Sequence, residues 1–221
     1  MNEKKVVVIT GGTSGLGLET VKLFLGSGWK VATCGRRKAR IDKLNSEGNP
    51  NLLADICDIS IDSSSALFLK EVEQSFGRID ILILNAATLG PIPLREVSDL
   101  NIMDLRMTFE INFFGNFQFM RMALPLLRDG GKIVHITSDA ATTPYPGWGA
   151  YSSSKIAFDL LLKILDKEIA SRRITAFSFD PGDMDTPMHR AALPDDKLNL
   201  KDPRIAAREL FEKVTDKEGR K

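Results

Sequence analysis

The chain has 221 residues, of which 43% are hydrophobic and 27% are charged. This balance is typical of a soluble globular domain with a sizeable core. Thirty basic and 29 acidic residues leave a formal net charge of +1, so no strong positive field attracts nucleic acid or an anionic membrane surface. We therefore expect no nucleic acid and no membrane among the partners.

The N-terminal segment and the cysteines predict a cytoplasmic protein. The apolar part of MNEKKVVVIT is too short for a secretory signal, and no run reaches the ~18 apolar residues of a membrane span. Only Cys34 and Cys57 are present, each at the end of an apolar run, which favours two core cysteines over a disulfide. No cluster of histidines and cysteines has metal-site spacing, so we expect no metal.

Short apolar runs rich in β-branched residues recur along the chain, with helical patterns between them. They lie at residues 5–10, 30–34, 51–54, 80–84, 132–137 and 174–179. Because these runs are continuously apolar, they predict strands that are buried on both faces and connected by helical crossovers. The predicted fold class is α/β: a Rossmann-type doubly wound parallel sheet of about six strands, with helices on both faces.

The chain predicts one domain over residues 1–221, because neither a repeat nor a linker separates two cores. We expect Gly77 to end the helix that follows Ser60, and Gly130 with Gly131 to end a long helix before the fifth strong strand. The polar, proline-punctuated residues 187–203 have the composition of a mobile segment over a substrate site. We expect no seventh parallel strand.

The first predicted strand runs directly into TGGTSGLG (residues 10–17), and a helical pattern follows. Glycines at such a turn let the backbone approach a pyrophosphate, which the amides and dipole at the helix N-terminus then stabilise. A P-loop is excluded because no Gly-Lys-Ser/Thr follows. This motif alone leaves a methyltransferase open. The predicted cofactor contacts here are Gly11, Thr13, Ser14, Gly15, Leu16 and Gly17.

The segment CGRRKAR (residues 34–40) lies about twenty residues further on, where a dinucleotide site contacts the adenosine ribose. A carboxylate there would accept a hydrogen bond from a 2′-hydroxyl and repel a 2′-phosphate, but this chain has Gly35 followed by Arg36 and Arg37. The pattern favours NADP(H) over NAD(H). The alternative interpretation is a solvated basic start to the second helix.

The segment YSSSK places Tyr151 and Lys155 four residues apart, on one face of a helix. A phenol has a reference pKa of ~10, and a neighbouring ammonium stabilises the phenolate and lowers that pKa. General acid–base catalysis near neutral pH needs such a change. Pairs with this spacing also occur on ordinary helix surfaces, so the pair gains weight only together with the glycine turn.

The ordered motifs resemble those of the short-chain dehydrogenase/reductase family. They are TGGTSGLG, LNAA (84–87), INFFGN (111–116), ITS (136–138), YSSSK and PGDMDT (181–186), and the resemblance runs from residue 6 to about 190. It implies that Tyr151 is the catalytic acid/base and that Lys155 binds the nicotinamide ribose and lowers the tyrosine pKa. It also implies that Ser138 orients the substrate carbonyl and that Asn112 holds a water in a proton relay through Lys155.

Further cofactor contacts are implied by the same resemblance. They are Asp58 and Ile59 towards the adenine, Asn85 and Ala86 on the adenosine side, and Pro181, Gly182 and Thr186 at the nicotinamide end. The family pattern often has an asparagine and a glycine where this chain has Leu84 and Ala87, a change that removes no catalytic group. Residues 144–155 are similar to the corresponding region of sepiapterin- and benzil-reductase-like members, which reduce bulky dicarbonyl compounds.

The resemblance implies an oxidoreductase that passes hydride between NADP(H) and a small carbonyl or alcohol substrate, with reduction the expected direction. The alternative is a non-catalytic dinucleotide sensor or scaffold on the same fold. We interpret His135 as a core residue and His189 as a candidate substrate contact. The helix over 111–127 is apolar nearly all round and, with residues 155–170, predicts a homodimer.

Overall fold

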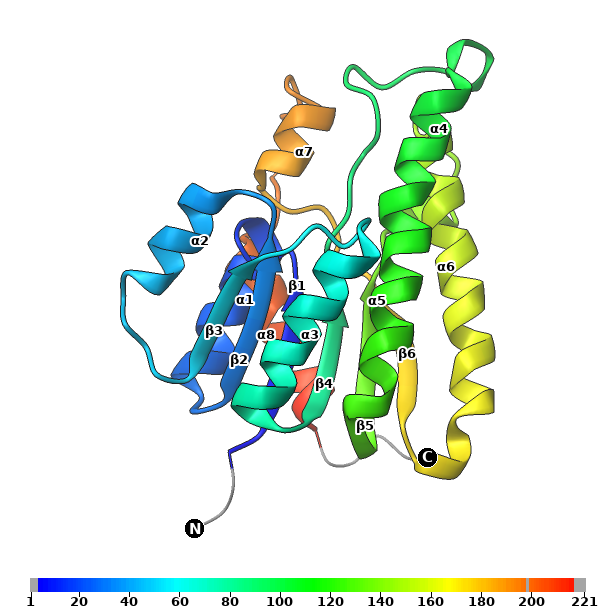
Figure 1. Cartoon of the computed structure of the whole chain (residues 1–221). Helices are drawn as coiled ribbons and strands as arrows, with labels where there is room; N and C mark the ends of the chain where they lie inside the picture. Colours follow the sequence, from blue (N-terminus) through cyan, green and yellow to red (C-terminus); the bar gives the residue numbers. More distant parts are fainter. Residues whose placement is uncertain (1–3, 198, 217–221) are drawn as a thin grey trace.

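The computed structural model describes residues 4–197 and 199–216, which form a six-stranded parallel sheet with helices on both faces (Figure 1). The strand order is β3-β2-β1-β4-β5-β6. The fold class and all six predicted strands are confirmed, and the described residues add no seventh strand to the sheet. The strands are β1 (Val6–Thr10), β2 (Lys30–Gly35), β3 (Leu52–Ile56), β4 (Ile79–Leu84), β5 (Leu127–Ile136) and β6 (Thr175–Phe179).

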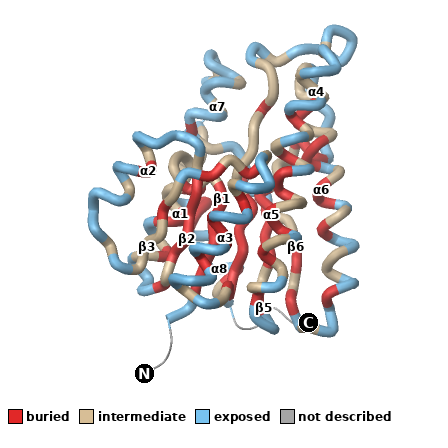
Figure 2. The backbone as a smooth tube through the Cα atoms, viewed as in Figure 1, coloured by how far each residue is buried: buried red, intermediate tan, exposed pale blue. Residues whose placement is uncertain are grey.

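Two helical layers cover the sheet. One face packs against α3, α5 and α6, and the other packs against α1 and α8. Figure 2 shows the resulting buried layer along the strands, and both predicted core cysteines are buried and free. The helices are α1 (Gly15–Gly26), α2 (Lys38–Asn45), α3 (Asp62–Phe76), α4 (Ile102–Phe109), α5 (Asn116–Ala123), α6 (Gly149–Glu168), α7 (Pro187–Ala192) and α8 (Pro203–Thr215).

The sheet explains the continuous apolar runs, because every residue of β1 and β4 is buried. Asp80 is the one ionisable residue in these two strands; its carboxylate accepts a hydrogen bond from the Val6 amide at 2.7 Å and lies 3.0 Å from Arg128. The chain builds outwards from β1 to β3 and then crosses to β4 on the other side of β1. In such sheets, ligands bind outside the carboxyl ends of the strands at this switch point.

The long helix before β5 ends earlier than its glycines predicted. α4 continues through a π-helical segment, Glu110–Gly115, into α5, which ends at Ala123. A short 3-10 turn with Pro125 follows, and the expected terminators Gly130 and Gly131 lie within β5. The prediction was wrong because proline already prevents the helix from continuing. By contrast, Gly77 ends α3 with a φ of 79°, as predicted.

The segment at 187–203 contains regular structure that its composition did not predict. Pro187–Ala192 form α7, and Pro203 is the first residue of α8. Near the far end, Lys201 exchanges backbone hydrogen bonds with the loop after β6, at 2.9 Å to Asp183 and 3.0 Å to Asp185. Throughout the part of the chain that the structure describes, no helix is both long enough and apolar enough to cross a bilayer.

Candidate active site

The glycine turn joins the end of β1 to the start of α1. Gly11 and Gly15 have φ values of 71° and 52°, which residues with side chains rarely adopt. A Cβ on Gly17 would lie 2.5 Å from the Asn85 side chain. The α1 N-terminus has no side-chain cap and no acidic residue in its first turn, so its amides and positive dipole remain available to an anion.

Asn85 and Ala86, which follow β4, are hydrogen-bonded to the start of this turn. The Asn85 Nδ2 donates to the carbonyls of Thr10 and Gly11 at 2.9 and 3.2 Å, and both backbone amides donate to the Thr10 hydroxyl at 3.0 Å. The side-chain Nδ2 of Asn85 therefore holds the backbone of the glycine turn in place. The side chains of Leu16 and Ile59 lie in the core, so only their backbone atoms can reach a cofactor.

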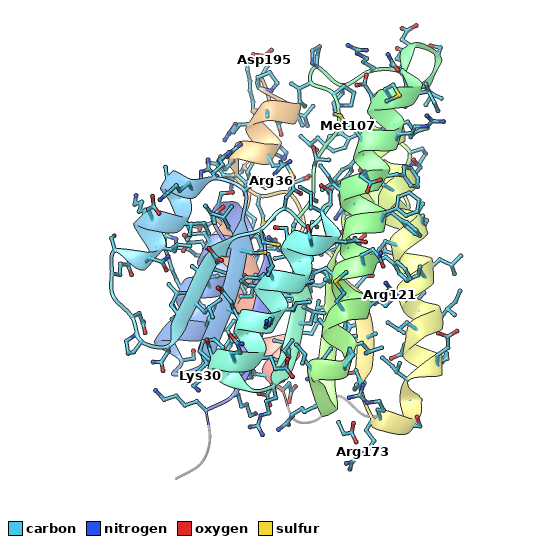
Figure 3. All side chains as sticks on the ribbon, in the orientation of Figure 1. Lys30, Arg36, Met107, Arg121, Arg173 and Asp195 are labelled. Atoms are coloured by element: carbon cyan, nitrogen blue, oxygen red, sulfur yellow. The ribbon has the colours of Figure 1, made fainter. Side chains whose placement is uncertain are left out.

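Arg36 and Asp58 lie together beyond the carboxyl ends of β2 and β3. The Arg36 guanidinium is 3.9 Å from the Asp58 carboxylate, and its side chain is 59% exposed. In the view of Figure 3, Arg36 lies between α2 and α7. Thr13 joins this group, because a Cβ on Gly35 would come within 2.8 Å of its side chain. Arg37 is also exposed and directly precedes α2. The predicted adenosine-side residues are thus close in space.

Tyr151 lies in the first turn of α6, near the carboxyl end of β5. It is only 7% exposed and packs with Leu89 and Ala140, and the Trp148 ring meets it edge-on at 5.6 Å. Ser138 follows β5, and its side chain lies near enough to Tyr151 to oppose part of the rise in the Tyr151 pKa. The Ser138 hydroxyl donates to Asp139 at 2.9 Å. Two members of the predicted quartet are therefore neighbours.

The pKa of Tyr151 is raised, mainly by burial and then by the carboxylates of Asp180, Asp139 and Asp159. The sequence predicted the opposite direction from the neighbouring Lys155. That effect is missing here because the Lys155 ammonium points to the sheet and lies 5.6 Å from the centre of the tyrosine ring. The phenol is therefore neutral around pH 7, which is the form that donates a proton.

Lys155 is 2% exposed. Its Nζ donates to the Ile136 carbonyl at 2.6 Å and lies 3.4 Å from His135 Nε2. Burial lowers the pKa of Lys155 to about 8, and the Asp159 carboxylate partly opposes this effect. His135 is a buried core residue, as predicted, but its contact with Lys155 also places it beside the candidate site.

Asn112 lies in the π-helical segment and is fully buried. Its side chain accepts from the Thr88 amide at 2.8 Å and donates to the Thr88 carbonyl and the Ser154 hydroxyl, each at 2.9 Å. It therefore ties the loop after β4 to α6, one residue before Lys155. The side-chain Nδ2 of Asn116 donates to the Asn112 backbone carbonyl at 3.2 Å. The water relay through Asn112 remains a prediction.

The loop after β6 reaches back to the glycine turn. A Cβ on Gly15 would lie 3.3 Å from Thr186, while Gly182, which follows Pro181, has a φ of 71°. Thr186 caps α7 by accepting from the His189 amide at 3.2 Å. The His189 ring lies 2.7 Å from the Asp196 carboxylate, so this side chain is partly committed within its own segment.

Sequence analysis missed three polar residues of the site. Asp139 binds both Ser138 and the Tyr145 hydroxyl, and Asn116 joins the loop after β4 to the π-helical segment. Asp159 lies one turn beyond Lys155 on α6 and contacts His135 at 2.8 Å. The spacing of four that paired Tyr151 with Lys155 could also have found Asp159.

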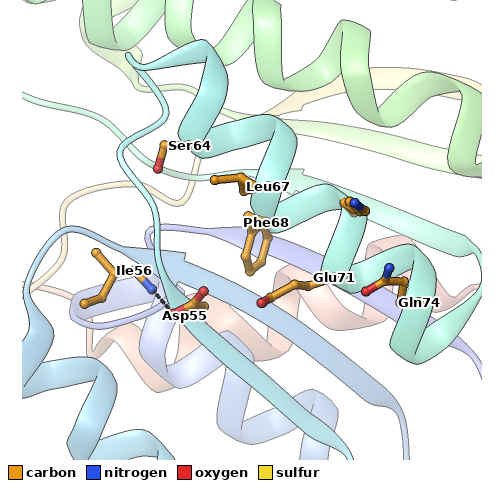
Figure 4. Close-up of a pocket in the computed structure, with 8 residues that line it drawn as sticks. Asp55, Ile56, Ser64, Leu67, Phe68, Glu71 and Gln74 are labelled. Carbon is orange, nitrogen blue, oxygen red and sulfur yellow. Dashed lines mark hydrogen bonds between the residues drawn. The ribbon is translucent and has the colours of Figure 1, made fainter.

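A hollow lies between the end of β3 and α3 (Figure 4), next to Asp58, whose backbone amide donates to the Ser64 hydroxyl at 3.2 Å. None of the predicted catalytic or cofactor residues lines it. Five of its eight lining residues are polar or charged, so it lacks the apolar enclosure typical of a small-molecule site. It is lined by Asp55, Ile56, Ser64, Leu67, Phe68, Lys70, Glu71 and Gln74.

A family profile for short chain dehydrogenases matches residues 5–197. The chain is 30% identical over 194 residues to a benzil reductase ((S)-benzoin forming) of Saccharomyces cerevisiae, covering 84% of this chain and 74% of that protein. A 3-ketoacyl-(acyl-carrier-protein) reductase from Brucella melitensis, complexed with NADH, superposes with a TM-score of 0.88 at 25% identity, over 96% and 91% of the two chains. An NADPH-bound short-chain oxidoreductase from Pseudomonas aeruginosa superposes with a TM-score of 0.84 at 26% identity, over 94% and 88%.

The chain belongs to the short-chain dehydrogenase/reductase family and is an NAD(P)-dependent oxidoreductase. Its cofactor is a nicotinamide dinucleotide. The uncapped N-terminus of α1 suits the pyrophosphate of such a cofactor, and Thr186 lies beside the glycine turn, 3.3 Å from where a Cβ on Gly15 would be. The residues present therefore fit the group.

Proposed function

We propose that the protein is an NADP(H)-dependent carbonyl reductase that uses Tyr151 as its proton donor. The observation that carries this proposal is the position of Tyr151, which is buried near Ser138 at the carboxyl end of β5, with the Lys155 ammonium 5.6 Å from the centre of its ring. The neutral phenol is the form that donates a proton, and we expect the Lys155 ammonium to lower the Tyr151 pKa once the bound cofactor holds that ammonium near the phenol. The yeast benzil reductase relative supports bulky aryl ketones and diketones as the substrate class.

The bound cofactor supplies the hydride to the carbonyl carbon, and the protein handles the oxygen. Ser138 turns its one hydroxyl proton from Asp139 to the carbonyl oxygen and orients that oxygen beside Tyr151, which then transfers its phenolic proton to it. Trp148 and the apolar residues around Tyr151 limit the access of water. Ala192 at the end of α7 packs into the same cluster, which supports residues 187–203 as the substrate cover.

A carbonyl panel tests this proposal. The purified protein should oxidise NADPH in the presence of benzil or related aryl diketones, and more slowly with simple ketones and quinones. Matched reactions without a carbonyl measure the background. Tight NADPH binding without turnover of any carbonyl would instead support the dinucleotide sensor.

The buried, free cysteines suit a reducing compartment and support a cytoplasmic location.

Arg36 is expected to make the enzyme prefer NADPH to NADH. An arginine fork meets a 2′-phosphate with charge-assisted hydrogen bonds that a 2′-hydroxyl cannot replace. Such bonds contribute ~1.5–3 kcal/mol, which corresponds to a preference of roughly ten- to a hundred-fold in apparent affinity. The Arg36 side chain is exposed, and its ion pair with Asp58 is long, at 3.9 Å. The guanidinium can therefore turn towards a 2′-phosphate.

Replacing Gly35 with aspartate and Arg36 with glutamine should reverse this preference. Because a Cβ at residue 35 would come within 2.8 Å of the Thr13 side chain, Gly35→Ala is measured as well, to separate this crowding from the effect of the charge. The new carboxylate would accept from the ribose hydroxyl and repel the phosphate. Michaelis constants for both cofactors measure the change, and Arg40→Glu, in the neighbouring helix α2, changes the net charge by the same amount and is the control. If the wild type has equal constants, or if the double variant keeps its preference, then the CGRR segment is only a solvated helix start.

We propose a homodimer formed through α4, α5 and α6. Three apolar residues of α6 are exposed at four-residue intervals, Ile156, Leu160 and Ile164, with Leu160 60% exposed. The neighbouring α4 and π-helical segment add exposed Met107 and Phe114, and Figure 1 shows these helices side by side at one end of the sheet. Apolar area of this kind is normally covered in a stable protein.

Light scattering at micromolar concentration should show a dimer, and Leu160→Glu should convert it to a monomer. A charge in the centre of the apolar contact would have to be buried without a partner, which is costly. Lys43→Glu changes an exposed charge on α2, which lies at the other end of the sheet, and should leave the dimer intact. A monomeric wild type would refute the proposed interface.

A further inference from the structure

A chain of polar contacts leads away from Lys155 into the protein, opposite to the substrate side. His135 Nδ1 lies 2.8 Å from one oxygen of the Asp159 carboxylate, and His135 Nε2 lies 3.4 Å from Lys155 Nζ. The hydroxyls of Thr137 and Ser178 donate to Asp159 at 2.6 and 2.5 Å. These five residues are named the Asp159 cluster. They come from α6, β6, β5 and the residue that follows β5.

The Asp159 cluster is built around a buried charge. His135 and Lys155 are 0% and 2% exposed, and the Asp159 side chain is 10% exposed. A buried ammonium is costly unless a carboxylate and hydrogen-bond acceptors compensate for it. Asp159 is the charged group that acts on Lys155. The Asp159 carboxylate is hydrogen-bonded to three side chains, which fix the position of its negative charge.

The hydrogen bonds also fix the state of His135. Burial alone would raise the pKa of Asp159, but donors from His135, Ser178 and Thr137 outweigh it, and the carboxylate stays ionised. An ionised Asp159 can only accept, so Nδ1 of His135 carries the proton and Nε2 presents a lone pair to Lys155. Burial, together with the Lys155 charge, lowers the pKa of His135 to about 4, which leaves the ring neutral around pH 7.

Helix α6 places Asp159 on the same buried face as the proposed catalytic pair, Tyr151 and Lys155. Tyr151, Lys155 and Asp159 follow at intervals of four on α6 and are all buried, so one face of the helix carries all three. The Phe158 ring packs at 4.5 Å from the His135 ring, which fixes the imidazole against the helix. The contact with Lys155 is therefore set by packing as well as by hydrogen bonding.

We propose that His135 and Asp159 are positioning residues for Lys155: they keep its ammonium protonated and hold it on the Ile136 carbonyl until the cofactor ribose takes it over. The proposal rests on the proposed function of Lys155 in binding the ribose. The charged and titratable groups that face the ammonium are Asp159 and Tyr151 from α6 and His135 from β5. Loss of the Asp159 charge should therefore favour the neutral amine.

The direct test measures the cofactor-free protein by nitrogen NMR. The chain has only two histidines, so the ring signals of His135 are readily assigned with a His189→Gln variant. The wild type should show His135 protonated at Nδ1, neutral down to about pH 4, with a second inflection as Lys155 titrates near pH 8. A proton on Nε2 would overturn the proposal, because Lys155 could not then donate to that atom.

The functional test compares NADPH dissociation constants across pH for the wild type, Asp159→Asn and Asp166→Asn. If the Lys155 pKa falls by about one unit in Asp159→Asn, binding should weaken about five-fold at pH 8 and hardly at all at pH 6. The control residue Asp166 also lies on α6 and accepts from the Ala176 amide at 2.9 Å, but it does not face Lys155. Its variant should keep the wild-type profile.

His135 is tested by a pair of variants in the same assay. His135→Gln keeps an acceptor for Lys155 and should stay within about three-fold of wild type, whereas His135→Leu removes it and should weaken binding about ten-fold. If folded Asp159→Asn and His135→Leu both bind NADPH with the same pH profile as the wild type, then the positioning role is wrong. If the wild type binds no dinucleotide, the proposed function fails, while the NMR measurement still decides how Lys155 is held.

Discussion

Tyr151→Phe is expected to bind NADPH within a few-fold of the wild-type affinity and to lose nearly all turnover. The ring would still pack against Trp148, but the proton that the carbonyl oxygen requires would be gone. General acid–base groups typically contribute 10²–10⁴-fold, so a fall of about that size in kcat is expected. Steady-state rates with the best carbonyl of the panel and fluorescence titration with NADPH measure the two effects separately.

Trp148→Phe is the matched control for this variant, because it disturbs the same aromatic contact and leaves the phenol in place. Its turnover should stay within about ten-fold of wild type, since packing changes cost less than the loss of the proton donor. If Tyr151→Phe retains a tenth of the wild-type rate, then the assignment of Tyr151 as the proton donor is wrong.

Lys155→Ala is expected to weaken NADPH binding and to reduce turnover at the same time. One ammonium is proposed to bind the ribose and, when the cofactor is present, to stabilise the phenolate that forms as Tyr151 loses its proton. Loss of a charged hydrogen bond of ~1.5–3 kcal/mol corresponds to a roughly ten- to hundred-fold higher dissociation constant. Calorimetric titration gives the binding effect, and single-turnover kinetics give the effect on the chemical step.

Lys155→Met separates charge from volume in this experiment. The lysine is buried, and an alanine would leave a cavity that methionine largely fills. Equal defects in both variants would assign the effect to the missing ammonium. An unchanged dissociation constant in Lys155→Met would contradict the dual role.

Local sequence patterns were sufficient for the sheet because burial on both faces leaves a direct record in the residues. Strands such as β4 are apolar at nearly every position, and the turn after β1 contains the glycines that its φ values require. The end of the long helix was predicted less well. Both Pro125 and the glycines at 130–131 can end a helix. Pro125 ends this one, because β5 already pairs with β4 from Leu127 onwards.

The site was predicted as a set of residues but not as a set of contacts. Helical spacing placed Tyr151 and Lys155 on one face, yet the direction of the ammonium depends on Ile136, which is 19 positions away in sequence. The same holds for Asn112, whose partner Ser154 is 42 positions away. Such contacts arise from packing between a helix and a sheet, which leaves no periodic signal in either segment.

Helix α6 has little surface left for neutral substitution. Tyr151, Lys155 and Asp159 occupy the buried face that adjoins the site, and Phe158 fills the core beside them. The solvent side carries the apolar stripe that begins at Ile156. Drift in this helix should therefore be confined to its exposed charged positions near the C-terminus, and a library of random variants should accumulate its silent changes at Lys163, Lys167 and Glu168.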